Sequence, residues 1–355
     1  MNKKIKIIAE AGVNHNGKKN LAYKLIESAK KANADYVKFQ TFSADNLASK
    51  KTKKAPYQRN TEEQSQYEML KKLELDNKAF KDLFKFSEEQ NIEIFSTPFD
   101  CDNLNFLCDL GMKRIKISSG EIMNGPLILE ASKKKLPIIL STGMCNLKDI
   151  EIALGVICIG FLGLKPKKIN FQFLNECYKD KFAKEMLKKK VTLMHCTTSY
   201  PCPASETNLL AIKTLKEKFG ISVGFSDHTI GKIASSLAVA LGADLLEKHF
   251  TLNKLMKGPD HKTSLNVKEL KDYVKYIADV RKYLGSKEKK IQTSEKKNVT
   301  VIRKSLYAKK KINKGELFSF HNLIYKRPFD GKSPLRYWNL INRKSKKNYS
   351  EGDLI

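Results

Sequence analysis

The stretch Leu245–Thr251, with the sequence LLEKHFT, decides how the chain is expected to fold. Its apolar start leads to His249, and another apolar run ends at His228, 21 residues earlier (249 − 228 = 21). Two apolar runs that end on histidines and are separated by a helix-length segment are typical of neighbouring parallel strands. We therefore expect His228 and His249 to lie at the same end of a parallel sheet and to face a common site.

The same design repeats along the chain. Amphipathic helices end at Gly or Asn, residues that tolerate a left-handed conformation, and a short apolar strand follows. The expected strands are Ile5–Ala9, Tyr36–Phe39, Ile92–Phe95, Arg114–Ile117, Ile138–Leu140, Val191–Met194, Ser222–Phe225 and Leu245–Leu246. Eight strand–helix units predict an α/β fold, a (β/α)8 TIM barrel. An open doubly wound sheet is the alternative, although no glycine-rich phosphate loop follows the first strand.

Polar and ionisable residues follow nearly every expected strand. They are Glu10, Lys38-Phe39-Gln40-Thr41, Ser96-Thr97-Pro98, Ser118-Ser119-Gly120-Glu121, Ser141-Thr142-Gly143, His195-Cys196-Thr197, Ser226-Asp227-His228 and Glu247-Lys248-His249. The carboxyl ends of barrel strands form the rim at which barrel enzymes carry out their chemistry. The sequence therefore predicts an active site on this rim.

Several rim residues suggest specific chemistry. His228 and His249 are candidate ligands of a divalent metal, since neutral imidazole suits Mn, Fe or Zn. Asp227 and Glu247 are expected to point away from the neighbouring histidines. Lys38 ends an apolar strand, where a charge is costly unless it meets an anion. It predicts binding of phosphate or carboxylate, with a Schiff-base lysine of an aldolase as the alternative.

Composition limits the other functions. The 355 residues carry 67 Lys and Arg against 38 Asp and Glu, a formal charge of +29. A solvated lysine-rich surface is the first explanation of this charge, and binding of a small anionic substrate is the second. The sequence has no nucleic-acid-binding pattern, so no nucleic-acid partner is expected. The seven cysteines include no CxxC pair, which fits free thiols in a reducing compartment.

No membrane association is expected. The amino terminus has no signal-peptide pattern, because Glu10 interrupts its apolar run. The longest apolar stretch, Ala153–Leu164, is too short to span a bilayer and predicts a buried helix. We therefore expect a cytoplasmic protein.

The chain divides into three predicted parts. Residues 1–286 form the barrel domain, residues 287–299 a charged linker, and residues 300–355 a small domain with strands at Ser305–Lys310, Leu317-Phe318 and Leu323–Lys326. Two connections exceed the usual length. Gln40–Asp76 resembles a lid, and Gly155–Lys190 predicts an insertion or an extra helical excursion.

The chain also resembles the sialic acid synthase family. The motifs are Ile8-Ala9-Glu10-Ala11-Gly12-Val13-Asn14-His15-Asn16-Gly17, Val37-Lys38-Phe39-Gln40-Thr41, Ser96-Thr97-Pro98-Phe99-Asp100, Ser119-Gly120-Glu121, Ser141-Thr142-Gly143-Met144, His195-Cys196-Thr197-Thr198, Ser226-Asp227-His228, Glu247-Lys248-His249-Phe250-Thr251 and Gly258-Pro259-Asp260-His261. They occur in the family's order over nearly the whole chain. Residues 300–355, with Lys326-Arg327-Pro328, are similar to the family's antifreeze-like (SAF, β-clip) domain.

This resemblance implies condensation of phosphoenolpyruvate with an N-acylated hexosamine to a nine-carbon 2-keto acid and phosphate. His228 and His249 would hold a divalent metal, Mn²⁺ first, with Mg²⁺ or Co²⁺ as alternatives. Phosphoenolpyruvate would be bound by Lys38, Thr97, Ser119 and Ser226, and the sugar by Glu10, Tyr200 and Asp260. Gln40, Thr198 and Arg327 complete the substrate-binding set, and Glu121, Lys38 and His249 are the candidate catalytic residues.

The resemblance leaves the acceptor open. N-acetylmannosamine, as in N-acetylneuraminate synthase, is placed first, and the 2,4-diacetamido-2,4,6-trideoxymannose of N,N'-diacetyllegionaminate synthase is the alternative. Pseudaminate synthase, a pyruvate-dependent metal aldolase and a non-catalytic barrel protein rank below both. Arg327 would reach the barrel of a partner in a domain-swapped homodimer. The family usually has a glycine directly after the Lys-Arg-Pro motif. In this chain Pro328 is instead followed by Phe329-Asp330-Gly331.

Overall fold

The chain forms two compact units, Met1–Gly285 and Ser286–Ile355. The computed structural model describes residues 4–355, except for the side chains of Arg59 and Asn60. Residues 1–3, with which the predicted barrel domain begins, lie outside the described residues. Each unit is a separate body with its own apolar core.

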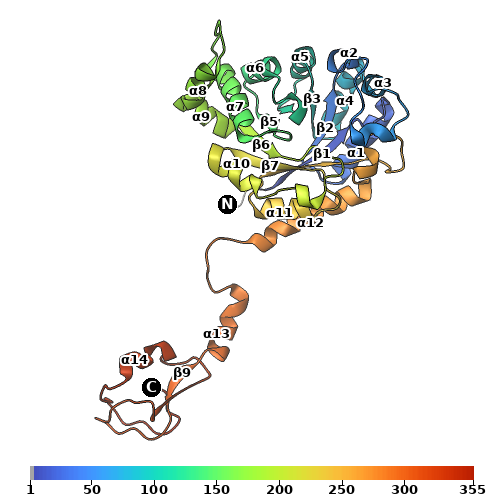
Figure 1. Cartoon of the computed structure of the whole chain (residues 1–355). Coiled ribbons are helices and arrows are strands. Elements are labelled where there is room, and N and C mark those ends of the chain that lie inside the picture. The colour runs from blue at the N-terminus through green and yellow to red at the C-terminus, as the bar shows by residue number, and fades with distance from the viewer. Residues whose placement is uncertain (1–3) are drawn as a thin grey trace. The chain divides into compact units, whose positions relative to one another are not determined.

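Eight parallel strands make the first unit a nearly closed barrel (Figure 1). They are β1 (Lys6–Gly12), β2 (Tyr36–Thr41), β3 (Glu93–Pro98), β4 (Ile115–Ile117), β5 (Ile138–Ser141), β6 (Val191–His195), β7 (Ser222–Asp227) and β8 (Leu245–His249). Their hydrogen-bonded order is β3-β2-β1-β8-β7-β6-β5-β4, and β3 also lies against β4. Because β1 pairs with both β2 and β8, the order is cyclic. This confirms the predicted (β/α)8 architecture and excludes the open doubly wound sheet.

Helices connect the strands and surround the barrel (Figure 1). They are α1 (Lys19–Lys31), α2 (Ala44–Leu47), α3 (Gln66–Leu73), α4 (Asn77–Glu89), α5 (Cys101–Asp109), α6 (Gly125–Lys133), α7 (Leu147–Leu162), α8 (Phe171–Lys179), α9 (Lys181–Lys190), α10 (Ala211–Phe219), α11 (Ile233–Ala240) and α12 (Val267–Leu284). Asn33, Asn91 and Gly220 adopt positive φ where helices end, as their residue types predict. The fold therefore follows the local sequence signals closely.

The strands extend beyond their expected ends. β7 continues from Phe225 to Asp227, and β8 from Leu246 to His249. The apolar sequence pattern ends at the first polar side chain. The backbone hydrogen bonds between neighbouring barrel strands continue beyond that residue. The polar rim residues therefore belong to the rigid strands themselves, and this fixes the positions of their side chains.

The two long connections have different structures. Gln40–Asp76 contains α2, α3 and a 3-10 turn at Pro56–Asn60, over a small core that includes Phe42 and Met69. Gly155–Lys190 contains the end of α7 followed by α8 and α9, so the predicted helical excursion is confirmed. α7 is buried, as Ala153–Leu164 predicted. Within residues 4–355, no helix combines the length and apolarity needed to cross a membrane.

The second unit is small and largely irregular. It contains α13 (Lys296–Ile302), β9 (Ser305–Ala308), β10 (Leu323–Lys326) and α14 (Tyr337–Leu340). β9 and β10 pair antiparallel over a core that includes Leu306, Phe318 and Tyr349. The expected strand Leu317-Phe318 is wrong, because Leu317 forms only an isolated bridge with Lys344. α13 runs through residues 299 and 300, where the predicted linker meets the predicted small domain.

Candidate active site

Four buried charged side chains meet inside the barrel near its carboxyl end. Lys38 Nζ lies 2.7 Å from Glu10 Oε2 and 3.7 Å from Glu247 Oε2, and it donates to Thr97 Oγ1 at 3.1 Å. Lys116 Nζ donates to both carboxylate oxygens of Glu247 at 2.9 Å. Two ammonium groups and two carboxyl groups thus form one cluster (Lys38, Lys116, Glu10, Glu247), which we call the inner cluster.

Burial and mutual charge set the protonation of the inner cluster. Burial raises the pKa of Glu10 to about 7, although the charge of Lys38 opposes the rise. Burial alone would lower the pKa of Lys38, but the charges of Glu10 and Glu247 outweigh it and the pKa is raised. Lys38 is therefore protonated near neutral pH and paired with the two carboxyl groups. Its raised pKa argues against the Schiff-base alternative, because a Schiff-base lysine must lose its proton to attack a carbonyl.

Lys116 and the orientation of Glu247 escaped the sequence analysis. Lys116 lies between Ile115 and Ile117, an apolar setting like that of Lys38, and the same argument would have found it. The expectation for Glu247 is wrong. It contacts Ser226 Oγ at 2.8 Å and Lys116 inside the barrel. Residues 247 and 249 are two apart on one strand, so both side chains point to the same face.

His228 and His249 lie together beside this cluster, as predicted. Their ring centroids are 5.8 Å apart. His228 Nδ1 lies 2.6 Å from the carbonyl oxygen of Thr197, which can only accept, so Nδ1 carries the proton and Nε2, with Ser226 Oγ 3.1 Å away, carries the lone pair. Burial lowers the pKa of His228 to about 4 and that of His249 well below its usual range. Both rings are therefore neutral near pH 7.

These two imidazoles fit a divalent metal. His249 Nδ1 is buried without a hydrogen-bond partner among the described residues, and Asp260 Oδ2 lies 3.9 Å away. Within residues 4–355, no three His, Cys, Asp or Glu side chains converge as ligands. The described chain thus offers the two imidazoles as donors here, fewer than the three protein ligands of a typical catalytic zinc site.

Tyr200 and Asp260 border the histidine pair. The Tyr200 ring lies 4.1 Å from the His228 ring and 5.6 Å from the His249 ring, between centroids. Asp260 is buried, which raises its pKa to about 6. Gln40 Nε2 donates to Glu10 Oε1 at 3.4 Å, so Gln40 also faces this part of the barrel. Glu10, Gln40, Tyr200 and Asp260, predicted to hold substrate, are brought near the two histidines.

A cluster of hydroxyl groups surrounds Gly143. A Cβ atom built on Gly143 would lie 2.4 Å from Thr198 Oγ1 and 2.8 Å from Ser119 Oγ, so only glycine fits without rearrangement. Ser119 Oγ accepts from the Gly143 backbone N–H at 3.0 Å. Thr198 Oγ1 is buried without a partner among the described residues. Such a cradle of donors suits an anionic oxygen.

Three further predicted site residues, Ser226, Glu121 and Arg327, have the following contacts. Ser226 lies between Glu247 and His228, 3.1 Å from His228 Nε2. Glu121 follows β4 in a 3-10 turn, and its Oε2 accepts from Asn124 at 2.7 Å. Arg327 belongs to the second unit, where its Nε donates to the carbonyl oxygen of Ile302 at 2.8 Å. Its predicted role in a partner's barrel stays a prediction.

The side chain of Asp227 points away from those of its neighbours Ser226 and His228, as expected. It pairs with Lys248 at 3.1 Å and accepts from Thr229 and Ser235, all outside the strand barrel. Tyr273 of α12 donates to Ser235 Oγ at 2.8 Å. We call Asp227, Thr229, Ser235, Lys248 and Tyr273 the outer network. It connects β7 and β8 to α11 and α12, and it holds in place the strand ends that carry His228 and His249.

This geometry can bind an anion, a divalent metal and a polar neutral molecule side by side. A model of the NeuB family matches residues 25–289. The N,N'-diacetyllegionaminic acid synthase of Campylobacter jejuni subsp. jejuni is 49% identical over 99% of this chain and 99% of its own length. That of Legionella pneumophila subsp. pneumophila is 40% identical over 98% of this chain and 92% of its own length.

Among solved structures, N-acetylneuraminic acid (sialic acid) synthetase from Leptospira borgpetersenii in complex with citrate is similar, with a TM-score of 0.68 and 32% identity. The match covers 84% of this chain and 90% of that protein. Sequence and fold thus agree over most of the barrel. The chain therefore belongs to the NeuB family and is a transferase-type enzyme of the sialic acid synthase type.

Proposed function

We propose that the protein condenses phosphoenolpyruvate with 2,4-diacetamido-2,4,6-trideoxymannose, forming N,N'-diacetyllegionaminate and phosphate. The observation that carries this choice of acceptor is 49% identity to a legionaminic acid synthase over 99% of both chains. The sialic acid synthetase structure is only 32% identical. These comparisons favour the alternative acceptor of the sequence analysis over N-acetylmannosamine, which was placed first.

Phosphoenolpyruvate would lie between the inner cluster and the cradle at Gly143. Lys38 and Lys116 supply buried positive charge for its carboxylate and phosphate. Thr97, Ser119, Thr198 and Ser226 supply hydroxyl donors nearby. Lys38, Lys116, Thr97, Ser119 and Ser226 are already held by hydrogen bonds or ion pairs, so they would bind and orient the anion with little reorganisation.

His228 and His249 would hold the divalent cation, Mn²⁺ first, with Mg²⁺ or Co²⁺ as alternatives. When bound, the metal would polarise the aldehyde of the open-chain acceptor. Tyr200, Asp260 and Glu10 would orient the sugar next to this position. Glu10, with a pKa raised to about 7, is able to hold or release a proton at neutral pH.

Glu121 is the proposed base for the water that adds to C2 of phosphoenolpyruvate. Carbon C3 attacks the aldehyde carbon and forms the new C–C bond, while the aldehyde oxygen takes up a proton and becomes a hydroxyl group; positive charge is left at C2. Water then adds at C2 and gives one proton to Glu121. As the C2 carbonyl forms, the C–O bond to phosphate breaks and the remaining proton of the water passes to the departing phosphate. Asn124 Nδ2 donates to the Glu121 carboxylate at 2.7 Å, which limits the positions that this carboxylate can adopt.

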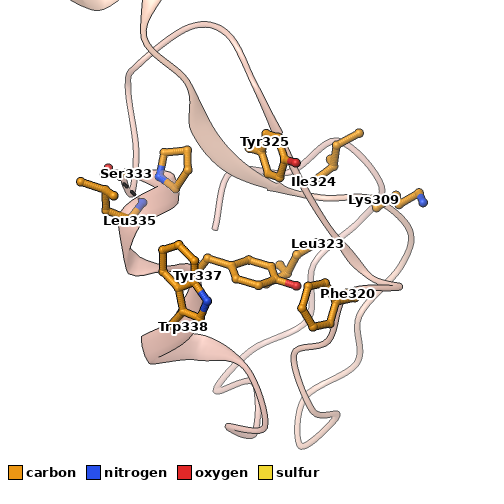
Figure 2. Close-up of a pocket in the computed structure, with 10 residues that line it drawn as sticks. Lys309, Phe320, Leu323, Ile324, Tyr325, Ser333, Leu335, Tyr337 and Trp338 are labelled. Atoms are coloured by element: carbon orange, nitrogen blue, oxygen red, sulfur yellow. Dashed lines mark hydrogen bonds between the residues drawn. The ribbon is translucent and has the colours of Figure 1, made fainter.

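We further propose that the second unit is an antifreeze-like (SAF) domain that packs against a second copy of this chain. It carries a pocket of about 620 Å³ lined by aromatic residues including Phe320, Tyr325, Tyr337 and Trp338 (Figure 2). Phe320 and Trp338 are 72% and 73% exposed, and exposed aromatic clusters mark interaction surfaces. Light scattering should give twice 40.4 kDa for the purified protein, 2 × 40.4 = 80.8 kDa. A monomer at micromolar concentration would refute this.

Phosphate release from phosphoenolpyruvate in the presence of Mn²⁺ tests the reaction. The two acceptors, 2,4-diacetamido-2,4,6-trideoxymannose and N-acetylmannosamine, are offered in parallel, with a reaction lacking acceptor as the control. We expect phosphate release mainly with the diacetamido sugar. Release mainly with N-acetylmannosamine would overturn the proposed acceptor. Condensation of pyruvate without phosphate release would indicate the metal-dependent aldolase alternative.

A further inference from the structure

The loop after β8 is fastened to the loop after β1 by residues that have no role in the proposed reaction. Asn16, in the loop after β1, donates from Nδ2 to the carbonyl oxygen of Lys257 at 2.9 Å. This carbonyl can only accept, so the Asn16 amide has one orientation, and its Oδ1 is the acceptor that lies 3.0 Å from His261 Nε2. His261 therefore carries its ring proton on Nε2 and donates it to Asn16.

The second ring nitrogen of His261 is used as well. Nδ1 lies 2.7 Å from Thr251 Oγ1 and, with the proton on Nε2, accepts from this hydroxyl. Burial lowers the pKa of His261 to about 4, so the ring is neutral near pH 7. The side chain is fully buried, and both of its polar atoms have partners. His261 thus suits a contact between the two loops and not the binding of a ligand.

Gly258 allows the two loops to come this close. A Cβ atom built on Gly258 would lie 2.7 Å from His261 Cδ2 and 2.9 Å from Asn16 Oδ1, so a side chain here would push the contact apart. The motif Gly258-Pro259-Asp260-His261 is therefore held at both ends, with Asp260 between them.

Asp260 is one of three candidate acceptor-binding side chains that meet at Gly12. A Cβ atom built on Gly12 would lie 3.7 Å from Asp260 Oδ2. It would lie 3.3 Å from Glu10 Oε1 and 3.4 Å from Gln40 Nε2. Glu10 and Gln40 belong to the strands β1 and β2, whereas Asp260 reaches this place from a loop. Its position therefore depends on the contacts that hold the loop, and His261 is the next residue in the chain.

We propose that His261 is a positioning residue, which holds the carboxylate of Asp260 at the place where the acceptor binds, beside His249. This inference rests on the proposed function, because it takes Asp260 as a group that binds the acceptor. His261 touches no substrate in this arrangement. Its loss should therefore lower kcat/KM for the acceptor and leave the binding of phosphoenolpyruvate unchanged.

The test measures phosphate release by wild type, His261→Leu and His261→Gln, with the acceptor that the wild type prefers. Leucine fills part of the space of the ring but can neither donate nor accept. His261→Leu should lower kcat/KM for the acceptor at least about tenfold, because misplacing a positioned group by ~1 Å costs up to ~100-fold. The KM for phosphoenolpyruvate should stay within about twofold. His261→Gln keeps a donor and an acceptor and should recover most of the loss.

Asn16→Gly breaks the same contact from the other loop. Asn16 has a φ of 50°, which glycine adopts without strain, so this variant should fold even if His261→Leu does not. It should also lower kcat/KM for the acceptor. Lys262→Met is the matched control, because it changes the exposed side chain next to His261 and should leave kcat/KM unchanged. Near-normal kcat/KM in a folded His261→Leu or Asn16→Gly variant, or an equal rise in the KM for phosphoenolpyruvate, would overturn the inference.

A double variant separates positioning of Asp260 from a general effect on the fold. In a chain that already carries Asp260→Ala, adding His261→Leu should lower kcat/KM for the acceptor by less than about twofold, because the group that it positions is gone. Effects that multiply in full would show that His261 acts by another route.

Failure of the proposed function would appear in the wild type alone, as absence of phosphate release with both candidate sugars. The contact between the loops is tested separately by amide hydrogen exchange. In His261→Leu, the amides of residues 253–264 should exchange at least about tenfold faster than in the wild type. Unchanged exchange would overturn the role of His261 whatever the acceptor is.

Discussion

The inner cluster and the outer network both bury charges and both include a residue of β8, but the polar atoms in the two regions are satisfied to different degrees. In the outer network, Asp227 accepts from Thr229 and Ser235 and pairs with Lys248. Next to the inner cluster, His249 Nδ1 and Thr198 Oγ1 are buried without partners in the described part of the chain. One region is complete in itself, and the other has unused donors and acceptors.

The difference teaches how structure and function are divided across the barrel wall. A buried polar atom without a partner costs about 1–3 kcal/mol, so it persists in a stable protein when something else uses it. A completed network of buried charges stabilises one arrangement of the strands. We infer that the outside of β7 and β8 maintains the fold, while the inside is prepared for substrates.

Breaking the outer network should give the largest effect, and it should appear in stability. Asp227→Ala leaves Lys248 buried without a countercharge, which costs about 3–5 kcal/mol. Urea denaturation measures this loss. The double variant Asp227→Leu with Lys248→Met should recover most of it, because neither charge then remains buried. Equal losses in the single and double variants would show that the ion pair is not the cause.

Removing a histidine from the inner side should instead affect activity. His249→Ala should reduce Mn²⁺-dependent phosphate release by more than ~100-fold, because loss even of residues that only support metal ligands costs 10–100-fold. Its free energy of unfolding should change less than that of Asp227→Ala. Calorimetry should show loss of Mn²⁺ binding. His321→Ala, which changes an exposed histidine of the second unit, is the control.

Near-normal activity of His249→Ala in buffer containing a chelator would contradict the metal assignment. A loss of stability as large as that of Asp227→Ala would contradict the division between the two sides of the strands.

The smallest expected effect is that of Thr198→Val, which should stabilise the folded protein and at the same time weaken the binding of phosphoenolpyruvate. Thr198→Val removes a buried hydroxyl that has no partner, so the protein should become more stable by up to about 1 kcal/mol. The KM for phosphoenolpyruvate should rise about tenfold, since one hydrogen bond to an anion is lost. Thr207→Val is the matched control. Its hydroxyl donates to the carbonyl oxygen of Pro203 at 3.2 Å, so its removal should destabilise the protein.

A Thr198→Val variant that loses stability would show that its hydroxyl already has a use in the free protein. The comparison between the two regions would then fail at this residue.

The barrel and most of the rim were predictable from sequence because their signals are local. Helix ends at Asn and Gly set the strand positions, and polar residues after apolar runs identified the rim. Lys38 was recognised as a buried charge in an apolar strand, whereas Lys116, in the same setting, was overlooked. Glu247 was misplaced because adjacent motif residues were considered together, although alternate residues of a strand share a face.

Other parts depend on contacts that no local pattern reports. Tyr57 meets Tyr200 across more than 140 residues of chain (200 − 57 = 143), so their contact follows from the closed barrel and not from either segment. The strand expected at Leu317-Phe318 is only a bridge, because a unit this small bends its chain around a short core. The role of Arg327 depends on a second copy of the chain and stays a prediction.

The excursion through α8 has a consequence for how such an enzyme can diversify. It follows α7 and precedes β6, so it joins the amino-terminal end of a strand, opposite to the end that carries the chemistry. Added residues there leave the reacting groups where they were. Lineages are thus free to gain or lose segments at this end, and protein engineers are free to attach tags or fusion partners there, without retuning catalysis.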